Sequence, residues 1–148
     1  MIDEQDEPTR EAVLAAASEI VDAFAATDGD RYFAAFALGA TFIFHTEPER
    51  LPDRAAYERL WAEWVEGGWR VVSCTSSDPF VQVFPGGAVF THSVETTVDT
   101  GEGTDTYRER ETIVFRLEPT VDDSPARLVA VHEHLSPMPE APAPDAAT

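Results

Sequence analysis

The sequence contains no lysine, a single cysteine and no apolar run of membrane-spanning length. All 10 basic residues are arginine, against 28 acidic residues, so the formal net charge at pH 7 is −18. A surface this acidic repels phosphate backbones and anionic lipid, which argues against nucleic acid and membranes as partners. The lone Cys74 excludes an intramolecular disulfide.

The amino-terminal residues also lack a secretory signal, because they are acidic and have neither a positive n-region nor an apolar h-region. We therefore expect a soluble, cytoplasmic protein. The 148 residues, 43% of them hydrophobic, suffice for one domain with a substantial core. We predict a disordered acidic lead over 1–8, a single domain over 9–136 and a flexible Pro/Ala-rich tail over 137–148.

Apolar spacing predicts three helices in the first half of the chain. The first covers about 9–27 with Thr9 as its N-cap, and a short second helix covers about 30–38. The third begins after Asp53 and ends at Gly67, and its apolar residues recur at the spacing of one buried stripe.

Strand-like alternation marks a short segment over 41–45 and the whole second half of the chain. The predicted strands of that half cover about 69–84, with a bend near Asp78, 88–98, 107–117 and 128–135, and a polar loop lies at 120–125. Helices come first and hairpin-linked strands last, which is typical of α+β folds. We predict a strongly curved antiparallel sheet packed on three amino-terminal helices.

The last strand carries an unusual number of polar side chains. Because side chains alternate between the two faces of a strand, His132 and His134 share one face, while Glu133 and Leu135 share the other. Unpaired polar groups are costly in a dry core, so this strand is expected to line a cavity or an interface.

Two strand sequences, RETIVF at 110–115 and VHEHLS at 131–136, together with the Trp-rich third helix, resemble the SnoaL-like branch of the nuclear transport factor 2-like superfamily. The closing VHEHLS is also similar to the association domain of calcium/calmodulin-dependent kinase II. The resemblance covers about 9–138 and implies a cone-shaped, cystatin-like fold with a pocket at its open end. It further implies homodimers, or larger rings, formed through the outer sheet face.

Functions in this superfamily range from ketosteroid isomerase and polyketide cyclase to binding and assembly modules. The fold therefore does not indicate which function this chain has, and the residues of its site must be considered. The kinase association domain carries arginines in its pocket strands. Ile113 and Leu135 stand where two of them are expected. The resemblance therefore does not extend to that domain's anionic ligand.

His132 and His134 could ligate one metal ion if His45 supplied a third ligand, since the family's first strand pairs with its last. Alternatively, these imidazoles form hydrogen bonds across a dimer interface or to Arg108 and Arg110. We favour the interface and predict no metal and no cofactor.

Glu111 and Glu133 lie on strands that are neighbours in the family's topology. If both face the concave side, one carboxyl would have a raised pKa and could act as a general acid or base. Alternatively, each is neutralised by an arginine, with Arg108 and Arg110 nearest in sequence. His45 and His92 are further candidate bases, although an inward His92 is more often a satisfied core residue.

Aromatic residues of the third helix are candidates for the pocket wall, which gives a predicted ligand pocket of Trp61, Trp64, His45, His92, Glu111 and Glu133. Three functions stay open. We favour a domain that binds a small hydrophobic molecule in a mostly apolar pocket. The alternatives are an acid/base enzyme of the isomerase or polyketide-cyclase type acting on a hydrophobic carbonyl compound, and a non-catalytic oligomerisation module.

Overall fold

The structure, a computed structural model, describes residues 6–119 and 126–139. Within them the chain forms three helices, α1 (Arg10–Ala25), α2 (Gly29–Ala34) and α3 (Arg54–Glu66). The five strands are β1 (Phe36–Phe44), β2 (Arg70–Phe84), β3 (Gly87–Asp99), β4 (Thr104–Glu118) and β5 (Arg127–Pro137). No described helix is long and apolar enough to cross a membrane.

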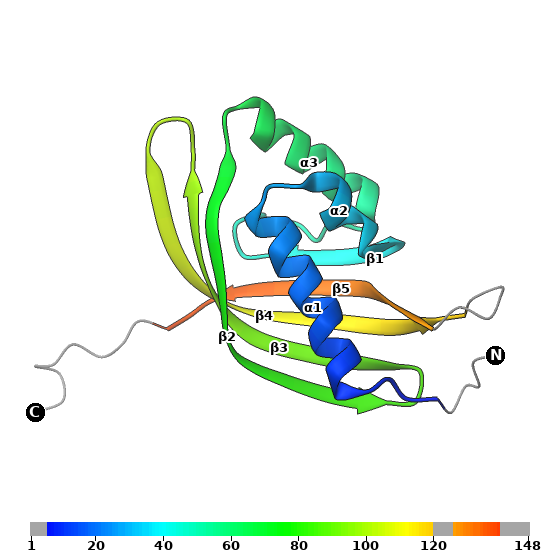
Figure 1. Ribbon diagram of the computed structural model, residues 1–148. Coiled ribbons are helices and arrows are strands. Elements are labelled where there is room, and N and C mark those ends of the chain that lie inside the picture. The colour runs from blue at the N-terminus through cyan, green and yellow to red at the C-terminus, as the bar shows by residue number, and fades with distance from the viewer. Residues whose placement is uncertain (1–5, 120–125, 140–148) are drawn as a thin grey trace, which may run out of the picture.

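The strands form one sheet in the order β1-β5-β4-β3-β2. Strands β2 to β5 form an antiparallel meander, and β1 joins the edge of the sheet by pairing in parallel with β5. The sheet curves strongly around the three helices, with α1 crossing in front of it (Figure 1). The predicted α+β cone is therefore confirmed.

Short polar side chains begin all three helices. Thr9, Asp28 and Asp53 each accept a hydrogen bond from the backbone N–H three residues further on, which satisfies one of the donors that a helix start leaves unpaired. The predicted caps Thr9 and Asp53 are thus confirmed, whereas Asp28, expected to end the first helix, begins α2.

The predicted second helix was too long. It ends at Ala34, and the segment that follows belongs to β1, where Gly39 is a strand residue and not a helix stop. Backbone pairing overrides the helical spacing here, because the Ala130 N–H of β5 donates to the Ala35 carbonyl at 2.9 Å. The predicted loop at 120–125, residues 1–5 of the acidic lead and residues 140–148 of the tail lie outside the described residues.

The bend predicted near Asp78 is present in β2. Pairing with β3 changes register between Ser77 and Phe80, and Asp78 adopts a positive φ of 53°. Pro79, which has no N–H to donate, sits in the same interruption. Strand β2 is therefore one long edge strand with a bulge in its middle.

Aromatic side chains fill the core between the helices and the sheet. Phe42 and Tyr57 lie with ring centroids 4.7 Å apart, edge to face, and Tyr32 stacks on Trp61 at 5.1 Å. Such pairs add about 0.5–1.5 kcal/mol each beyond the burial of their area. The cluster fastens α2 and α3 to β1 and so fixes which side chains reach the concave face.

Gly87, at the start of β3, leaves no room for a side chain. A Cβ there would collide with the Phe115 carbonyl oxygen and lie 3.1 Å from the Phe84 ring. We expect Gly87→Ala to lower the free energy of unfolding by about 1–3 kcal/mol, measured by urea denaturation. Gly39→Ala is the matched control, because a Cβ there meets nothing within 4 Å. Equal stability of the two variants would contradict the assigned packing at Gly87.

Candidate functional site

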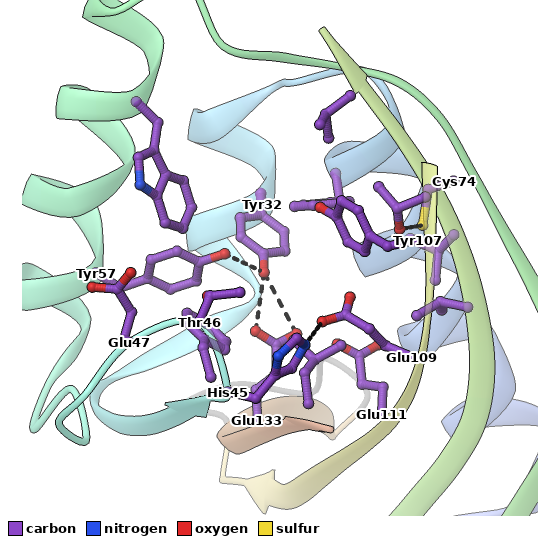
Figure 2. Close-up of a pocket in the computed structure, with 18 of the residues that line it drawn as sticks. Tyr32, His45, Thr46, Glu47, Tyr57, Cys74, Tyr107, Glu109, Glu111 and Glu133 are labelled. Atoms are coloured by element: carbon purple, nitrogen blue, oxygen red, sulfur yellow. Dashed lines mark hydrogen bonds and ion pairs between the residues drawn. The ribbon is translucent and has the colours of Figure 1, made fainter. Parts of the chain in front are cut away.

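A cavity of about 500 Å³ lies between the concave face of the sheet and the helices. Its walls are mainly apolar and aromatic, and they include Phe24, Tyr32, Phe44, Tyr57, Trp64 and Trp69. Four glutamates also line it, as does His45: Glu109, Glu111 and Glu133 come from the strands, and Glu47 follows β1. Figure 2 shows the carboxyl groups of Glu109, Glu111 and Glu133 gathered on one side. The Tyr32 hydroxyl is directed toward Glu133, and the Tyr57 hydroxyl toward that of Tyr32.

Glu111 and Glu133 form a hydrogen-bonded carboxyl pair. They come from the adjacent strands β4 and β5, where Glu133 is opposite Ile113 and Glu111 is opposite Leu135. Burial raises the pKa of Glu133 well above its ordinary value, and the Glu111 charge raises it further. Burial also raises the pKa of Glu111. Two carboxyl groups in hydrogen-bond contact cannot both ionise readily. The pair therefore shares one proton, which Glu133 holds more tightly than Glu111.

Tyr32 and Tyr57 connect this pair to the helices. The Tyr32 hydroxyl donates to Glu133 Oε1 at 3.1 Å, and the two phenol oxygens lie 2.9 Å apart. Because Tyr32 uses its one hydrogen on Glu133, Tyr57 must donate to Tyr32. Burial raises the pKa of both phenols well above the ordinary value, so both hydroxyls stay protonated donors.

His92 and Ser76 continue the hydrogen-bond chain behind Glu111. His92 Nε2 lies 2.6 Å from Glu111 Oε1, and its Nδ1 lies 2.5 Å from Ser76 Oγ. Burial lowers the pKa of His92 to about 4, so the ring is neutral near pH 7 and carries one N–H. With that N–H on Nε2 it donates to the Glu111 carboxylate, and Nδ1 accepts from the Ser76 hydroxyl.

Nearer the mouth of the cavity, His45 Nε2 lies 2.5 Å from Glu109 Oε2. The His45 side chain is 34% exposed and that of Glu109 is 11% exposed. Burial raises the pKa of Glu109, and the hydrogen bond from His45 opposes this shift. Strand β1 ends at Phe44, so the strand alternation that would have placed His45 beside Ile43 does not reach it.

The structure brings four of the six predicted pocket residues, Trp64, His45, Glu111 and Glu133, to the cavity. Trp61 is not among the lining residues, because its ring is 7% exposed and packs between Phe24 and Tyr32. His92 is not among them either, because it hydrogen-bonds to Glu111 from behind.

The sequence analysis missed four contributors to this site: Tyr32, Tyr57, Glu109 and Ser76. Glu109 has the same strand parity as Glu111, so alternation along β4 could have found it. Ser76 carries no such signal. It meets His92 only because the register of β2 on β3 brings the two together.

The arginines do not neutralise the carboxyl pair, contrary to the alternative reading of the sequence. Arg108 lies on the outer face, 3.9 Å from the exposed Glu95 of the neighbouring strand. Arg110 is exposed on β4. The pair is stabilised instead by its shared proton and by the neutral donors Tyr32 and His92.

His132 and His134 lie on the face of β5 opposite to Glu133, with ring centroids 6.2 Å apart. His132 Nδ1 is 2.7 Å from Thr41 Oγ1 of β1. His45 faces the cavity, so it does not join them. Among residues 6–119 and 126–139, no three His, Cys, Asp or Glu side chains are placed so that they could hold a metal ion together. Pairing of two copies through this outer face stays a prediction.

The family model described as a SnoaL-like domain matches residues 13–140. The chain belongs to the SnoaL-like domain family. This confirms the resemblance seen in its strands. No curated protein sequence matches this SnoaL-like chain significantly.

Solved structures show the same fold. An NTF2-like protein of unknown function in nutrient uptake from Rhodospirillum rubrum has a TM-score of 0.72 at 17% identity, over 85% of this chain and 98% of that one. The CaMKII hub of S. rosetta has a TM-score of 0.67 at 23% identity, over 88% of this chain and 99% of that one. A ketosteroid isomerase-like protein from Erwinia carotovora atroseptica has a TM-score of 0.71 at 13% identity, over 88% of this chain and 96% of that one. At these identities the likeness concerns the fold alone.

The carboxyl pair of this SnoaL-like domain predicts how its stability depends on pH. Because folding raises the pKa of Glu133 above 4.5, the native state binds more protons than the unfolded state above that pH, and stability falls as the pH rises. Glu133→Gln cannot ionise. We expect it to gain stability relative to the wild type as the pH rises from about 5 to about 8, by up to about 1.4 kcal/mol per pH unit. Urea denaturation across this range measures the difference.

His92, whose pKa is lowered to about 4, contributes the opposite trend below its ordinary value of 6.5. His92 is present in the wild type and in Glu133→Gln, so its contribution largely cancels when their free energies of unfolding are subtracted. Glu95→Gln on the outer face is the matched control and should follow the wild type at every pH. Parallel curves for Glu133→Gln and the wild type would mean that Glu133 is ionised in the folded protein.

Proposed function

We propose that this domain binds a small, mainly apolar molecule in the cavity, with its polar end against the cluster of Glu111, Glu133 and Tyr32. The observation that carries this proposal is the cavity of about 500 Å³, which aromatic side chains line without filling. Its volume lies in the range of about 300–1,000 Å³ that is usual for small-molecule sites. Apolar walls supply affinity there, and a few convergent polar groups orient the ligand.

The polar groups beside the cavity support the same function. Burying ionisable groups costs free energy, and well-packed hydrophobic residues are often equally stable or more so. Glu109, Glu111 and Glu133 are each at most 8% exposed and gather around one open space. A cluster of titratable groups with shifted pKa values in a cleft is a candidate functional site.

Blocking the cavity tests the proposal. Thr96 is buried and lines the cavity, whereas Thr97 points to the outer face, where its hydroxyl lies 2.7 Å from that of Thr106. We expect the neutral fluorescent probe N-phenyl-1-naphthylamine to bind the wild type and Thr97→Trp saturably. Thr96→Trp fills the space and should weaken this binding about tenfold or more, since each lost 1.4 kcal/mol is a factor of ten.

Thermal unfolding of both variants establishes that each is folded before the titration. Unchanged probe binding by folded Thr96→Trp would place the binding elsewhere and contradict the proposal.

A second candidate function, general acid–base catalysis on a hydrophobic carbonyl compound, is favoured by the carboxyl pair itself. Glu133 holds a proton while Glu111, bonded to His92, is the more readily ionised partner, and both line the same cavity. Groups whose surroundings push their pKa values apart are suited to divide the roles of acid and base. Glu111 would remove a proton from the carbon atom next to the carbonyl group, while Glu133 would donate its proton to the carbonyl oxygen.

Exchange of hydrogen for deuterium beside the carbonyl of 2-tetralone, followed by NMR in D₂O, tests this candidate. We expect the wild type to accelerate the exchange and Glu111→Gln to reduce the acceleration about 100-fold or more. Glu95→Gln, on the outer face, should exchange at the wild-type rate. If the wild type gives no acceleration, the acid–base candidate is contradicted, while probe binding in the cavity is unaffected.

A further inference from the structure

Aromatic side chains form much of the cavity wall. Trp64 and Trp69 lie 5.2 Å apart on one side, and Phe24 lies 6.2 Å from Trp69. Tyr107 of β4 lines the cavity as well. The π face of such a ring carries negative charge and attracts a cation.

The charged groups of the cavity have one sign. Glu47, Glu109, Glu111 and Glu133 line it, and no arginine does so among the described residues. The one basic side chain of the lining, His45, is engaged by Glu109. At −18 overall, the protein also attracts cations and repels anions over longer distances.

We propose that the cavity takes an organic cation, a small apolar molecule that carries an ammonium group beside the Glu111–Glu133 pair. This inference rests on the proposed binding function and deepens it by naming the ligand class. The apolar body of the ligand lies among the rings of Phe24, Trp64 and Trp69. Its N–H donors replace the proton that the two carboxyl groups share in the empty cavity.

Binding is then coupled to proton release. In the free protein the pair carries one proton and one negative charge. When the ammonium enters, the shared proton leaves to solvent and the cation takes its place between two carboxylates, so the site with its ligand carries −1 and the solvent gains one proton. Affinity for the ammonium therefore rises with pH, whereas affinity for a neutral molecule that accepts a hydrogen bond from Glu133 falls.

Three naphthalene probes of nearly equal size test the inference by isothermal titration calorimetry: 2-(1-naphthyl)ethylamine, 2-(1-naphthyl)ethanol and 1-naphthylacetate. We expect the amine, which is an ammonium ion at pH 7, to bind at least ten times more tightly than the alcohol, and the carboxylate to bind more weakly than both. Titration in two buffers of different ionisation enthalpy measures the protons released, and about one per amine bound is expected.

Variants assign the effect to the carboxyl pair. Glu133→Gln leaves no shared proton, so amine binding to it should release almost none. The double variant Glu111→Gln/Glu133→Gln should lose the preference for the amine over the alcohol. Glu95→Gln, which replaces an exposed carboxylate on the outer face, should keep both the preference and the proton release.

The opposite results are equally specific. Alcohol binding as tight as amine binding would overturn the cation assignment and leave the proposed binding function standing. A preference for the amine that persists in the folded double variant would show that it does not come from the Glu111–Glu133 pair and would overturn the inference. Failure of all three probes, with N-phenyl-1-naphthylamine still bound, would overturn it as well. Failure of the wild type to bind N-phenyl-1-naphthylamine, or unchanged binding by folded Thr96→Trp, is the separate outcome that contradicts the proposed function itself.

Discussion

The proton shared by Glu111 and Glu133 is the constraint on which the arrangement of this site depends. Two carboxyl groups in a largely dry interior cannot both carry charge, and every neighbour that reaches them must be a neutral donor or acceptor. Tyr32, Tyr57 and His92 meet this requirement, since burial keeps both phenols protonated and the imidazole neutral. The pair therefore joins α2 and α3 to strands β3, β4 and β5 through one continuous hydrogen-bond chain.

Aromatic packing keeps that chain in place. The ring of Tyr32 lies against those of Phe33, Phe36 and Trp61, while its hydroxyl reaches Glu133. Each tyrosine thus belongs to the apolar core through its ring and to the polar cluster through its oxygen. The sheet curves around the helices (Figure 1). The polar cluster borders the cavity on the concave side of this sheet and is not enclosed in a solid core.

Local patterns predicted much of this structure from the sequence. The helix caps at Thr9 and Asp53, the bend at Asp78 and the inward direction of Glu111 and His92 all follow from spacing and alternation, which act over a few residues. The meeting of Tyr32 with Tyr57, and that of Ser76 with His92, depends on segments that only the folded sheet brings together. The end of α2 was misplaced for a related reason, because pairing with β5 extends β1 into a sequence of helical spacing.

The exposed edge of the sheet has a consequence for how copies of the chain meet. A long unpaired strand offers backbone groups on which the strand of another molecule could assemble, and β2 presents 15 residues at such an edge. The bulge at Asp78 and Pro79 breaks this row in its middle: the backbone turns out of line there, and one donor is absent. Extension of the sheet from one molecule into the next is thereby interrupted. This edge of the sheet is therefore poorly suited to the open-ended stacking that leads to fibres.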